Sequence, residues 1–167
     1  NEILYAATSS GVFTFDTSNE ELNPRNFEDW VELITTEFIA LDVLGDIVYG
    51  ATGNEIYELS SGGLSLQKDV GATIVKLSND GTNLVVSTED NVYVYEIVSF
   101  TIVDSLDVSS VTSHAFDIVK TVLLNDTYYI ATSEYGILTS EKSNKVTFEE
   151  IHPNGPSSNS VFRVTIS

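Results

Sequence analysis

Apolar and polar residues alternate over short stretches of this chain, in a pattern that predicts β-strands. Residues 82–88 and 91–97 are rich in β-branched and aromatic side chains, and both stretches are too short for helices. In 91–97 the valines fall on one face and the tyrosines on the other, as in a strand. No stretch has sustained helical periodicity, although residues 23–33 could hold one helical turn after a proline. The pattern therefore indicates an all-β protein.

One short unit occurs four times. Each copy has an apolar strand ending in a small residue and a threonine, a short polar turn, and a second strand, and the four threonines are Thr8, Thr52, Thr88 and Thr132. They lie 44, 36 and 44 residues apart, and a period near 40 indicates a repeat architecture. We expect each hydroxyl to bond the backbone of its turn, and each small residue to allow close approach of a neighbouring sheet. A catalytic role for four repeated threonines is improbable, since a catalytic site is normally single.

Two further strands flank each hairpin, so the unit has four strands, A to D. Strand A is apolar and is expected to be buried on both faces. Strand D is more polar and has the charges of an edge strand. Four-stranded antiparallel units repeating about every 40 residues are the blades of a β-propeller.

The repeat divides the chain into a β-propeller segment of about four blades. Strands B, C and D of blade one are assigned to residues 1–37, blade two to 38–72, blade three to 73–115, blade four to 116–151, and strand A of the next blade to 160–167. Two architectures remain open. Either the segment is an arc of a larger propeller, which we favour, or residues 160–167 pair with the first strand and close a four-bladed ring. The total number of blades does not follow from the sequence.

Composition narrows the function. The 167 residues are 42% hydrophobic and have a net charge of −18. This negative charge disfavours binding to nucleic acid, and it disfavours binding to anionic membranes through basic residues. A solvated acidic surface is the favoured interpretation, although basic partners or cations are allowed. The absence of cysteine excludes disulfides and thiolate chemistry. The sequence has no run of 18 apolar residues, as a membrane-spanning helix would need, and no visible signal peptide. It contains no methionine, and we interpret it as a mature or excised segment.

The candidate chemical groups favour structural roles. His114 and His152 have no triad-like spacing to Asp or Ser and are expected in loops. Residues 78–83 resemble the Asp-box of sialidases, but they lack its spacing and tryptophan and are better explained as an A–B turn. Residues 124–127 are explained in the same way. Residues 60–65 lack the lysine and helix of a phosphate-binding loop and are assigned to a C–D turn.

Metal and partner sites are also not indicated. The acidic pairs at 20–21, 28–29 and 149–150 lack the ligand spacing of a calcium loop. The chain has only two arginines, Arg25 and Arg163, so an arginine site that binds the carboxylate of a glycan is not indicated. Trp30 and most tyrosines are expected in packing, with Tyr135 at a rim. We therefore expect no catalytic, cofactor or metal residue, and the partner-binding residues stay unknown.

Residues 131–164 resemble the propeller repeats known as two-component-regulator propellers, which have a glycine before strand C and an entry such as residues 156–161 before the next strand A. More narrowly, residues 148–162, with 4–13 and 22–33, are similar to the PorZ-type proteins of Bacteroidetes, which belong to the type IX secretion system. This resemblance implies an exported, two-propeller protein with a C-terminal secretion-signal domain, in an attachment complex beside a sortase that joins cargo to anionic lipopolysaccharide. It supplies no catalytic motif.

The leading functional hypothesis is a non-enzymatic, extracytoplasmic propeller that acts as a scaffold or recognition module in this complex. Its partners would be a protein such as the sortase, or surface lipopolysaccharide. The alternatives are the ligand-sensing periplasmic propeller of a hybrid two-component receptor and, least favoured, a propeller that hydrolyses glycans. Nucleic acid, a membrane span and a cofactor are not expected.

Overall fold

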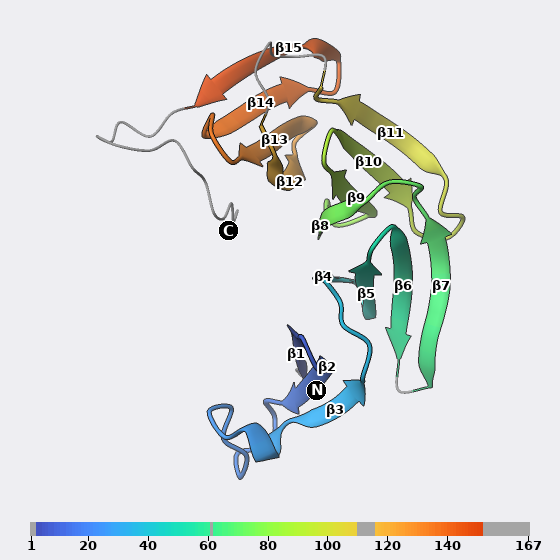
Figure 1. The fold of residues 1–167 in the computed structure, drawn as a ribbon, viewed down its shortest axis with the longest axis vertical. Helices are drawn as coiled ribbons and strands as arrows, with labels where there is room; N and C mark the ends of the chain where they lie inside the picture. The colour runs from blue at the N-terminus through green and yellow to red at the C-terminus, as the bar shows by residue number, and fades with distance from the viewer. Residues whose placement is uncertain (1–2, 61, 110–115, 152–167) are drawn as a thin grey trace.

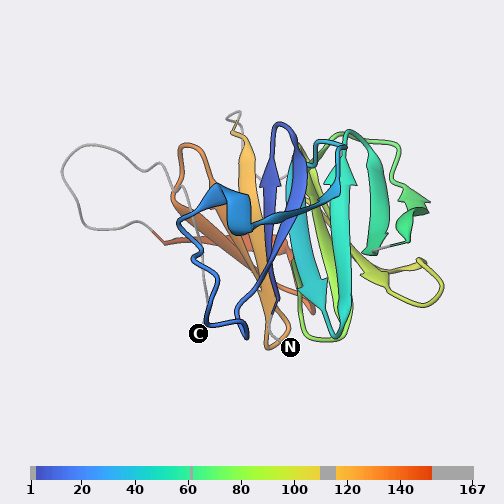
Figure 2. The ribbon, with the colours of Figure 1, turned by 90° about the horizontal axis from the view of Figure 1, so that it is seen from below.

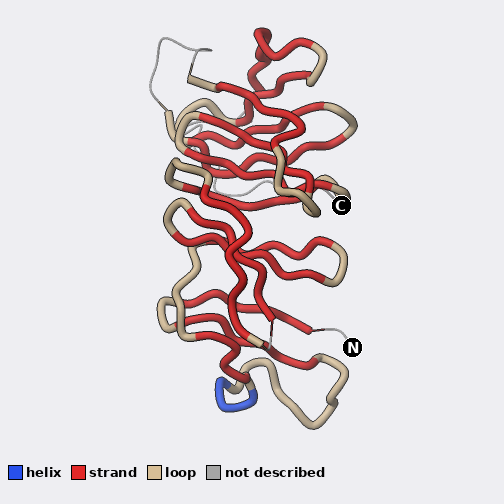
Figure 3. Tube along the Cα trace, turned by 90° about the vertical axis from the view of Figure 1, so that its right-hand side faces the viewer, coloured by secondary structure: helices blue, strands red, loops and turns tan. Residues whose placement is uncertain are grey.

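The computed structural model describes residues 3–60, 62–109 and 116–151, which are almost entirely antiparallel β-structure (Figure 1). The only helical element in these ranges is one 3-10 turn, η1 (Phe27–Asp29), which lies in the segment where the sequence allows a helical turn. Figure 3 shows this turn as a small blue segment among strands joined by short loops. No helix in the described part of the chain is both long and apolar enough to span a bilayer.

Four sheets follow one another along the chain. The first has three strands: β1 (Ile3–Thr8), β2 (Gly11–Asp16) and β3 (Val31–Ile34). The second has four: β4 (Ala40–Leu44), β5 (Ile47–Thr52), β6 (Glu55–Ser60) and β7 (Gly63–Asp69). The third consists of β8 (Ile74–Asn79), β9 (Asn83–Thr88), β10 (Asn91–Glu96) and β11 (Ile102–Asp107). The fourth consists of β12 (Ile118–Leu124), β13 (Thr127–Thr132), β14 (Ile137–Glu141) and β15 (Asn144–Ile151).

The sheets are the blades of a β-propeller. Within each sheet the strands pair in chain order, and strands β4, β8 and β12 lie on the inner side of a curved row of sheets (Figures 1 and 2). The described sheets form an open arc and do not close into a ring. The strand predicted at residues 160–167, which would close a four-bladed ring, lies outside the described residues.

The core lies between the sheets. The boundary of the first and second sheets buries four residues, Val12, Phe38, Val48 and Leu59. The two later boundaries bury larger apolar clusters, one centred on Tyr49, Ile56 and Tyr95 and the other on Val94, Tyr128 and Ile130. Each blade therefore hides the apolar face of its neighbour, which is the main source of stability in such a stack.

The repeated threonines act as the sequence predicts in three of four turns. Thr8, Thr88 and Thr132 donate to the carbonyl oxygen of the residue that follows the turn, at 3.0, 3.0 and 3.1 Å, and each also accepts from a turn N–H. Thr52 makes neither bond within the described residues; its turn contains Gly53, whose φ is +60°. A two-residue turn with a left-handed glycine closes without help from a side chain.

The small residue before the threonine is buried, as close packing of a neighbouring sheet requires, in three of the four copies. Ala51, Ser87 and Ala131 are buried, whereas Ala7 is exposed. Gly50 lies against Phe38 and Leu59, which belong to the apolar cluster at the boundary of the first and second sheets. A Cβ on Gly50 would lie 2.6 Å from Phe38 Cδ1 and 2.8 Å from Leu59 Cδ1. The backbone of β5 can approach these side chains only because the position has no side chain of its own.

The prediction that strand A is buried on both faces is wrong. The most buried strand of the third sheet is the second one, β9, in which every residue from Leu84 to Thr88 is buried. The inner strands β4 and β8 expose Val43 and Lys76. An inner strand lies at the edge of its sheet and borders the central space, whereas β9 has a strand on each side and a sheet on each face.

Candidate functional site

The connection between β2 and β3, residues 17–30, is the feature in which the first blade departs from the others. The corresponding connections in the later blades are residues 61–62, 97–101 and 142–143. A connection of this greater length in a compact repeat is usually functional or disordered. Its internal hydrogen bonds distinguish these two cases.

Four side chains in and beside this connection cap the backbone two residues further on. Asp16, Asn19, Asn23 and Asn26 accept from the N–H groups of Ser18, Glu21, Arg25 and Glu28, at 2.9, 3.1, 3.0 and 3.3 Å. The bonds from the Ser18 hydroxyl and N–H hold the pKa of the Asp16 carboxyl below its usual value. Such Asx turns fix a loop by local contacts alone.

Longer contacts close the connection on itself. Asp29 Oδ2 accepts from the Asn23 N–H at 2.9 Å, and Trp30 Nε1 donates to the Pro24 carbonyl oxygen at 3.0 Å. The connection is therefore ordered, and its surface is held in one conformation before any partner binds.

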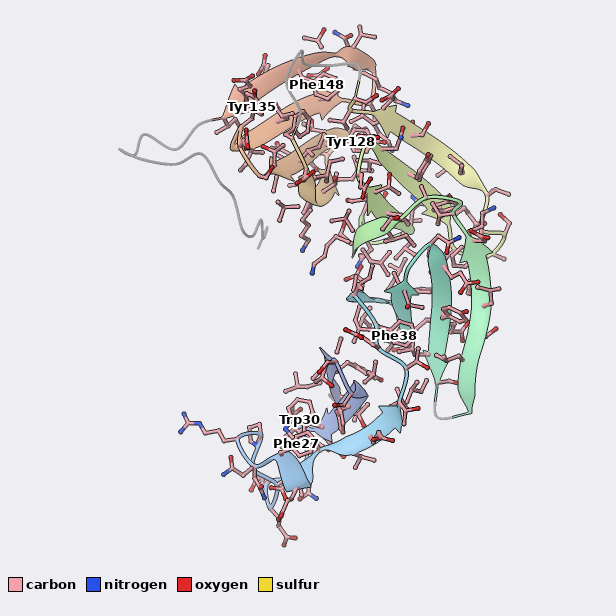
Figure 4. The ribbon with its side chains drawn as sticks, in the orientation of Figure 1. Phe27, Trp30, Phe38, Tyr128, Tyr135 and Phe148 are labelled. Carbon is pink, nitrogen blue, oxygen red and sulfur yellow. The ribbon has the colours of Figure 1, made fainter. Side chains whose placement is uncertain are left out.

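The same connection covers the face of the first sheet that points away from the second sheet. Phe27 lies 5.0 Å from Phe13, and Trp30 lies 5.3 Å from Phe15, measured between ring centres. Figure 4 shows Phe27 and Trp30 on the far side of the first sheet from Phe38. We call Phe13, Phe15, Phe27 and Trp30 the aromatic cap. In the later blades the corresponding face is covered by the preceding sheet.

The outer surface of the cap is apolar and bordered by carboxylates. Phe27 and Val31 are each 67% exposed, and the connection before Val31 also exposes Glu20, Glu21 and Glu28. An exposed aromatic residue on a rigid loop with a charged rim has the composition of a protein-binding surface. The net charge of −18 makes a basic partner surface the better match.

The strongest polar contact between blades lies at the third boundary. Asp104 of β11 accepts from the Tyr128 hydroxyl of β13 at 2.8 Å and pairs with the Lys145 ammonium of β15. Burial alone would raise the pKa of Asp104, but the bonds from Lys145 and Tyr128 outweigh it and lower that pKa. Burial and the neighbouring Asp104 carboxylate raise the pKa of Tyr128 far above its usual value. Asp104 bonds to both Tyr128 and Lys145, so we interpret this contact as structural.

The inner strands are joined by direct hydrogen bonds. Asn79 Nδ2 donates to Asp42 Oδ2 at 2.7 Å and to the Val43 carbonyl oxygen at 3.1 Å, linking β8 to β4. Ser78 Oγ donates to the Thr121 carbonyl oxygen at 2.6 Å, linking β8 to β12. These bonds fix the spacing of neighbouring blades at the inner side of the arc.

The segments that resemble known motifs are turns, as predicted. Residues 78–83 form the β8–β9 turn, where Gly81 has a φ of +90° and Asp80 accepts from the N–H groups of Thr82 and Asn83. Residues 124–127 form the β12–β13 turn, with Asn125 and Asp126 in the left-handed region. Residues 60 and 62–65 span the turn between β6 and β7.

The other candidates are scattered. His114, His152 and Arg163 lie outside the described residues. Tyr135 is partly buried and packs edge-on against Phe116, with ring centres 5.8 Å apart (Figure 4). No group of three metal-ligating side chains occurs within residues 3–60, 62–109 and 116–151. The sequence did not single out the aromatic cap, although the length of residues 17–30 beside the other C–D connections was a visible signal.

The outer face of the fourth sheet contains a shallow hollow of about 410 Å³. Its lining comes from β13, β14 and β15 and includes Tyr129, Thr139, Glu149 and Ile151. This face is more polar than the equivalent face of the third sheet, where Val85 and Val94 are buried.

No known protein family matches the sequence, and no curated protein resembles it. Several solved structures do share its fold. The extracellular domain of the putative hybrid two-component system BT4673 from B. thetaiotaomicron has a TM-score of 0.64 and 16% identity, covering 93% of this chain and 21% of that one. PorZ, a bacterial surface component of the type IX secretion system of Porphyromonas gingivalis, has a TM-score of 0.60 and 16% identity, covering 93% and 20%. BamB from Moraxella catarrhalis has a TM-score of 0.60 and 11% identity, covering 89% and 50%.

These likenesses establish the class of fold. PorZ and BamB are propeller-type proteins, and the chain is similar to them along nine-tenths of its length. The chain spans between a fifth and a half of the length of the three proteins. The described blades therefore form a β-propeller segment.

Proposed function

We propose that this chain is part of an exported, non-enzymatic propeller that acts as a scaffold or recognition module, and that the aromatic cap contacts its partner. The observation that carries this proposal is the ordered connection 17–30, which presents Phe27 at 67% exposure on a rigid blade. A loop held by its own side-chain bonds loses little entropy when a partner binds.

The more specific proposal is an attachment-complex protein of a type IX secretion system, located outside the cytoplasm. Its partner would be a protein such as the sortase, or surface lipopolysaccharide. This proposal is supported by the structural similarity to PorZ, a surface component of that system. Of these two partners, the apolar surface of the cap favours the protein.

A sensory propeller is the second candidate. The extracellular domain of BT4673, described as part of a two-component system, is as similar to this chain as PorZ is, at 16% identity in both cases. A sensor would bind a small ligand and alter transcription, whereas a scaffold would hold a protein and alter attachment of cargo.

Deletion of the parent gene separates the two candidates. A scaffold predicts that secreted cargo no longer reaches the cell surface, with genome-wide transcription otherwise unchanged. A sensor predicts that transcription changes while secreted cargo still reaches the cell surface. The proposal is abandoned if surface cargo is unaffected, and a screen of the full-length protein that found saturable glycan hydrolysis would overturn its non-enzymatic character.

Point variants test the cap itself. In the deletion strain, a parent gene carrying Phe27→Ala should restore surface cargo less completely than the wild type. Val98→Ala is the matched control, because Val98 is an apolar residue on another turn and is 89% exposed. Equal restoration by both variants would place the partner surface elsewhere.

A further inference from the structure

Two lysines occupy the same step of the repeat on neighbouring inner strands. Lys76 is the third residue of β8 and Lys120 the third residue of β12. Each follows an irregularity in strand pairing, between Ile74 and Lys76 in one blade and between Ile118 and Lys120 in the next. The two side chains therefore leave equivalent points of adjacent blades. The second blade has Ala40 at this step, opposite Ala51.

The two strands lie directly beside each other. Ser78 Oγ of β8 donates to the Thr121 carbonyl oxygen of β12 at 2.6 Å, two residues from Lys76 and one from Lys120. β8 contacts β4 on one side and β12 on the other. It lies at the inner side of the arc (Figure 1), so we infer that an exposed side chain on this strand borders the central space. Lys76 is exposed, and Lys120 is half-buried.

Both ammonium groups are uncompensated within the described residues. The other described lysines all have partners: Lys142 pairs with Asp126, Lys145 pairs with Asp104, and Lys68 lies over the ring of Tyr95. The protein has 25 acidic residues and seven basic ones, so a lysine without an acidic partner is unexpected. Two of them on adjacent strands repel each other, and a bound anion would relieve that repulsion.

The backbone at this place adds further donors. β8 and β12 are edge strands of their sheets, so each has a row of N–H and C=O groups that no strand of its own sheet pairs. Ammonium groups at the edge of a sheet are suited to oxygen anions, which accept several hydrogen bonds at once.

We propose that Lys76 and Lys120 form a binding site for an anionic oxygen group, a carboxylate or a phosphate, on the inner wall of the arc. This site shares no residue with the aromatic cap, and the proposal is independent of the proposed scaffold function. The net charge of −18 repels anions at long range, so recognition must come from these short-range contacts. Binding is then favoured for a compact group that meets both ammoniums.

Calorimetric titration of the full-length protein with inorganic phosphate, and separately with acetate, tests the site and distinguishes the two anions. We expect saturable binding of at least one of them at low salt. The variants Lys76→Gln and Lys120→Gln should each weaken it about tenfold, as expected for loss of one charge-assisted contact. Raising the ionic strength to about 0.5 M should weaken it further, because the ammoniums are partly exposed.

Two variants serve as controls. Lys142→Gln removes the same charge from an outer turn and should leave the affinity unchanged, while Lys76→Arg keeps the charge and should retain binding. The proposal is overturned if the wild type shows no saturable binding of either anion up to about 10 mM. It is also overturned if the double variant Lys76→Gln/Lys120→Gln binds as tightly as the wild type. Neither result would alter the Phe27→Ala test of the scaffold function.

Discussion

The hydroxyl of Tyr128 donates a 2.8 Å hydrogen bond to Asp104 across the boundary between the third and fourth blades. Tyr128 is fully buried, so this bond has little competition from water. It ties β13 of one blade to β11 of the other.

Replacing Tyr128 with phenylalanine should lower the free energy of unfolding by about 1–3 kcal/mol, because a buried charge-assisted bond is lost and the packing is kept. Urea denaturation monitored by circular dichroism measures the change. Tyr129→Phe is the control, since Tyr129 is on the same strand and its hydroxyl has no partner among the described residues. Equal effects of the two variants would refute the assignment.

The same pair predicts the dependence of stability on pH. The pKa of Asp104 is lowered by folding, so its contribution is fully present above about pH 3.9 and is lost as the pH falls through the folded value. The pKa of Tyr128 is raised, so stability falls as the pH rises above about 10, where the unfolded chain releases the phenolic proton.

Urea midpoints measured across this range test both arms. Asp104→Asn should reduce the fall in the urea midpoint at acid pH (the acid arm), and Tyr128→Phe should reduce its fall at alkaline pH (the alkaline arm). The alkaline assignment fails if Tyr128→Phe leaves that arm as steep as in the wild type.

A side chain at position 50 should be poorly tolerated. In Gly50→Ala the new Cβ would meet Phe38 and Leu59 at less than 3.0 Å, so these side chains or the β5 backbone must shift, and overpacking of this kind costs about 1–3 kcal/mol. Gly62→Ala is the comparison, because its nearest contact is 3.6 Å away. Thermal unfolding of both variants gives the difference, and a Gly50→Ala protein as stable as Gly62→Ala would contradict the close contact.

The turn threonines allow a matched test within one repeat. Thr88→Val and Thr132→Val each remove a hydroxyl that both donates and accepts, and should destabilise by about 1–2 kcal/mol. Thr52→Val should have little effect, because Thr52 makes no such bond in the described part of the chain. Chemical denaturation of the three variants measures the change in the free energy of unfolding. If Thr52→Val lowers it as much as the other two variants, the effect comes from packing and not from the hydrogen bonds.

The isolated chain should self-associate. The described blades form an open arc whose two ends expose Leu4 on one side and Ile151 on the other. Light scattering over a range of concentrations should show a mass that rises with concentration. A mass that stays at 18.2 kDa would favour a closed four-bladed ring.

Much of the fold was predictable because it is local. The threonine hairpins, the turns at residues 78–83 and 124–127, and the edge position of strand D depend on neighbours within a few residues. The burial of strand A was predicted incorrectly because apolar composition does not reveal which edge of a sheet borders the central space. The contact of Lys145 with Asp104 joins residues 41 positions apart, and the cap places Phe27 on Phe13. Local pattern does not specify such pairings, although the length of residues 17–30 pointed to the region of the cap.

Among the described strands, every partner is the next strand in the chain, and every sheet packs on the sheet just before or after it. Contacts of such short range close quickly, since little loop entropy is lost. A chain of this design can form its structure one blade at a time, with each new blade docking on the blade before it. At the first described blade, the aromatic cap supplies the cover that a preceding sheet gives to the later blades.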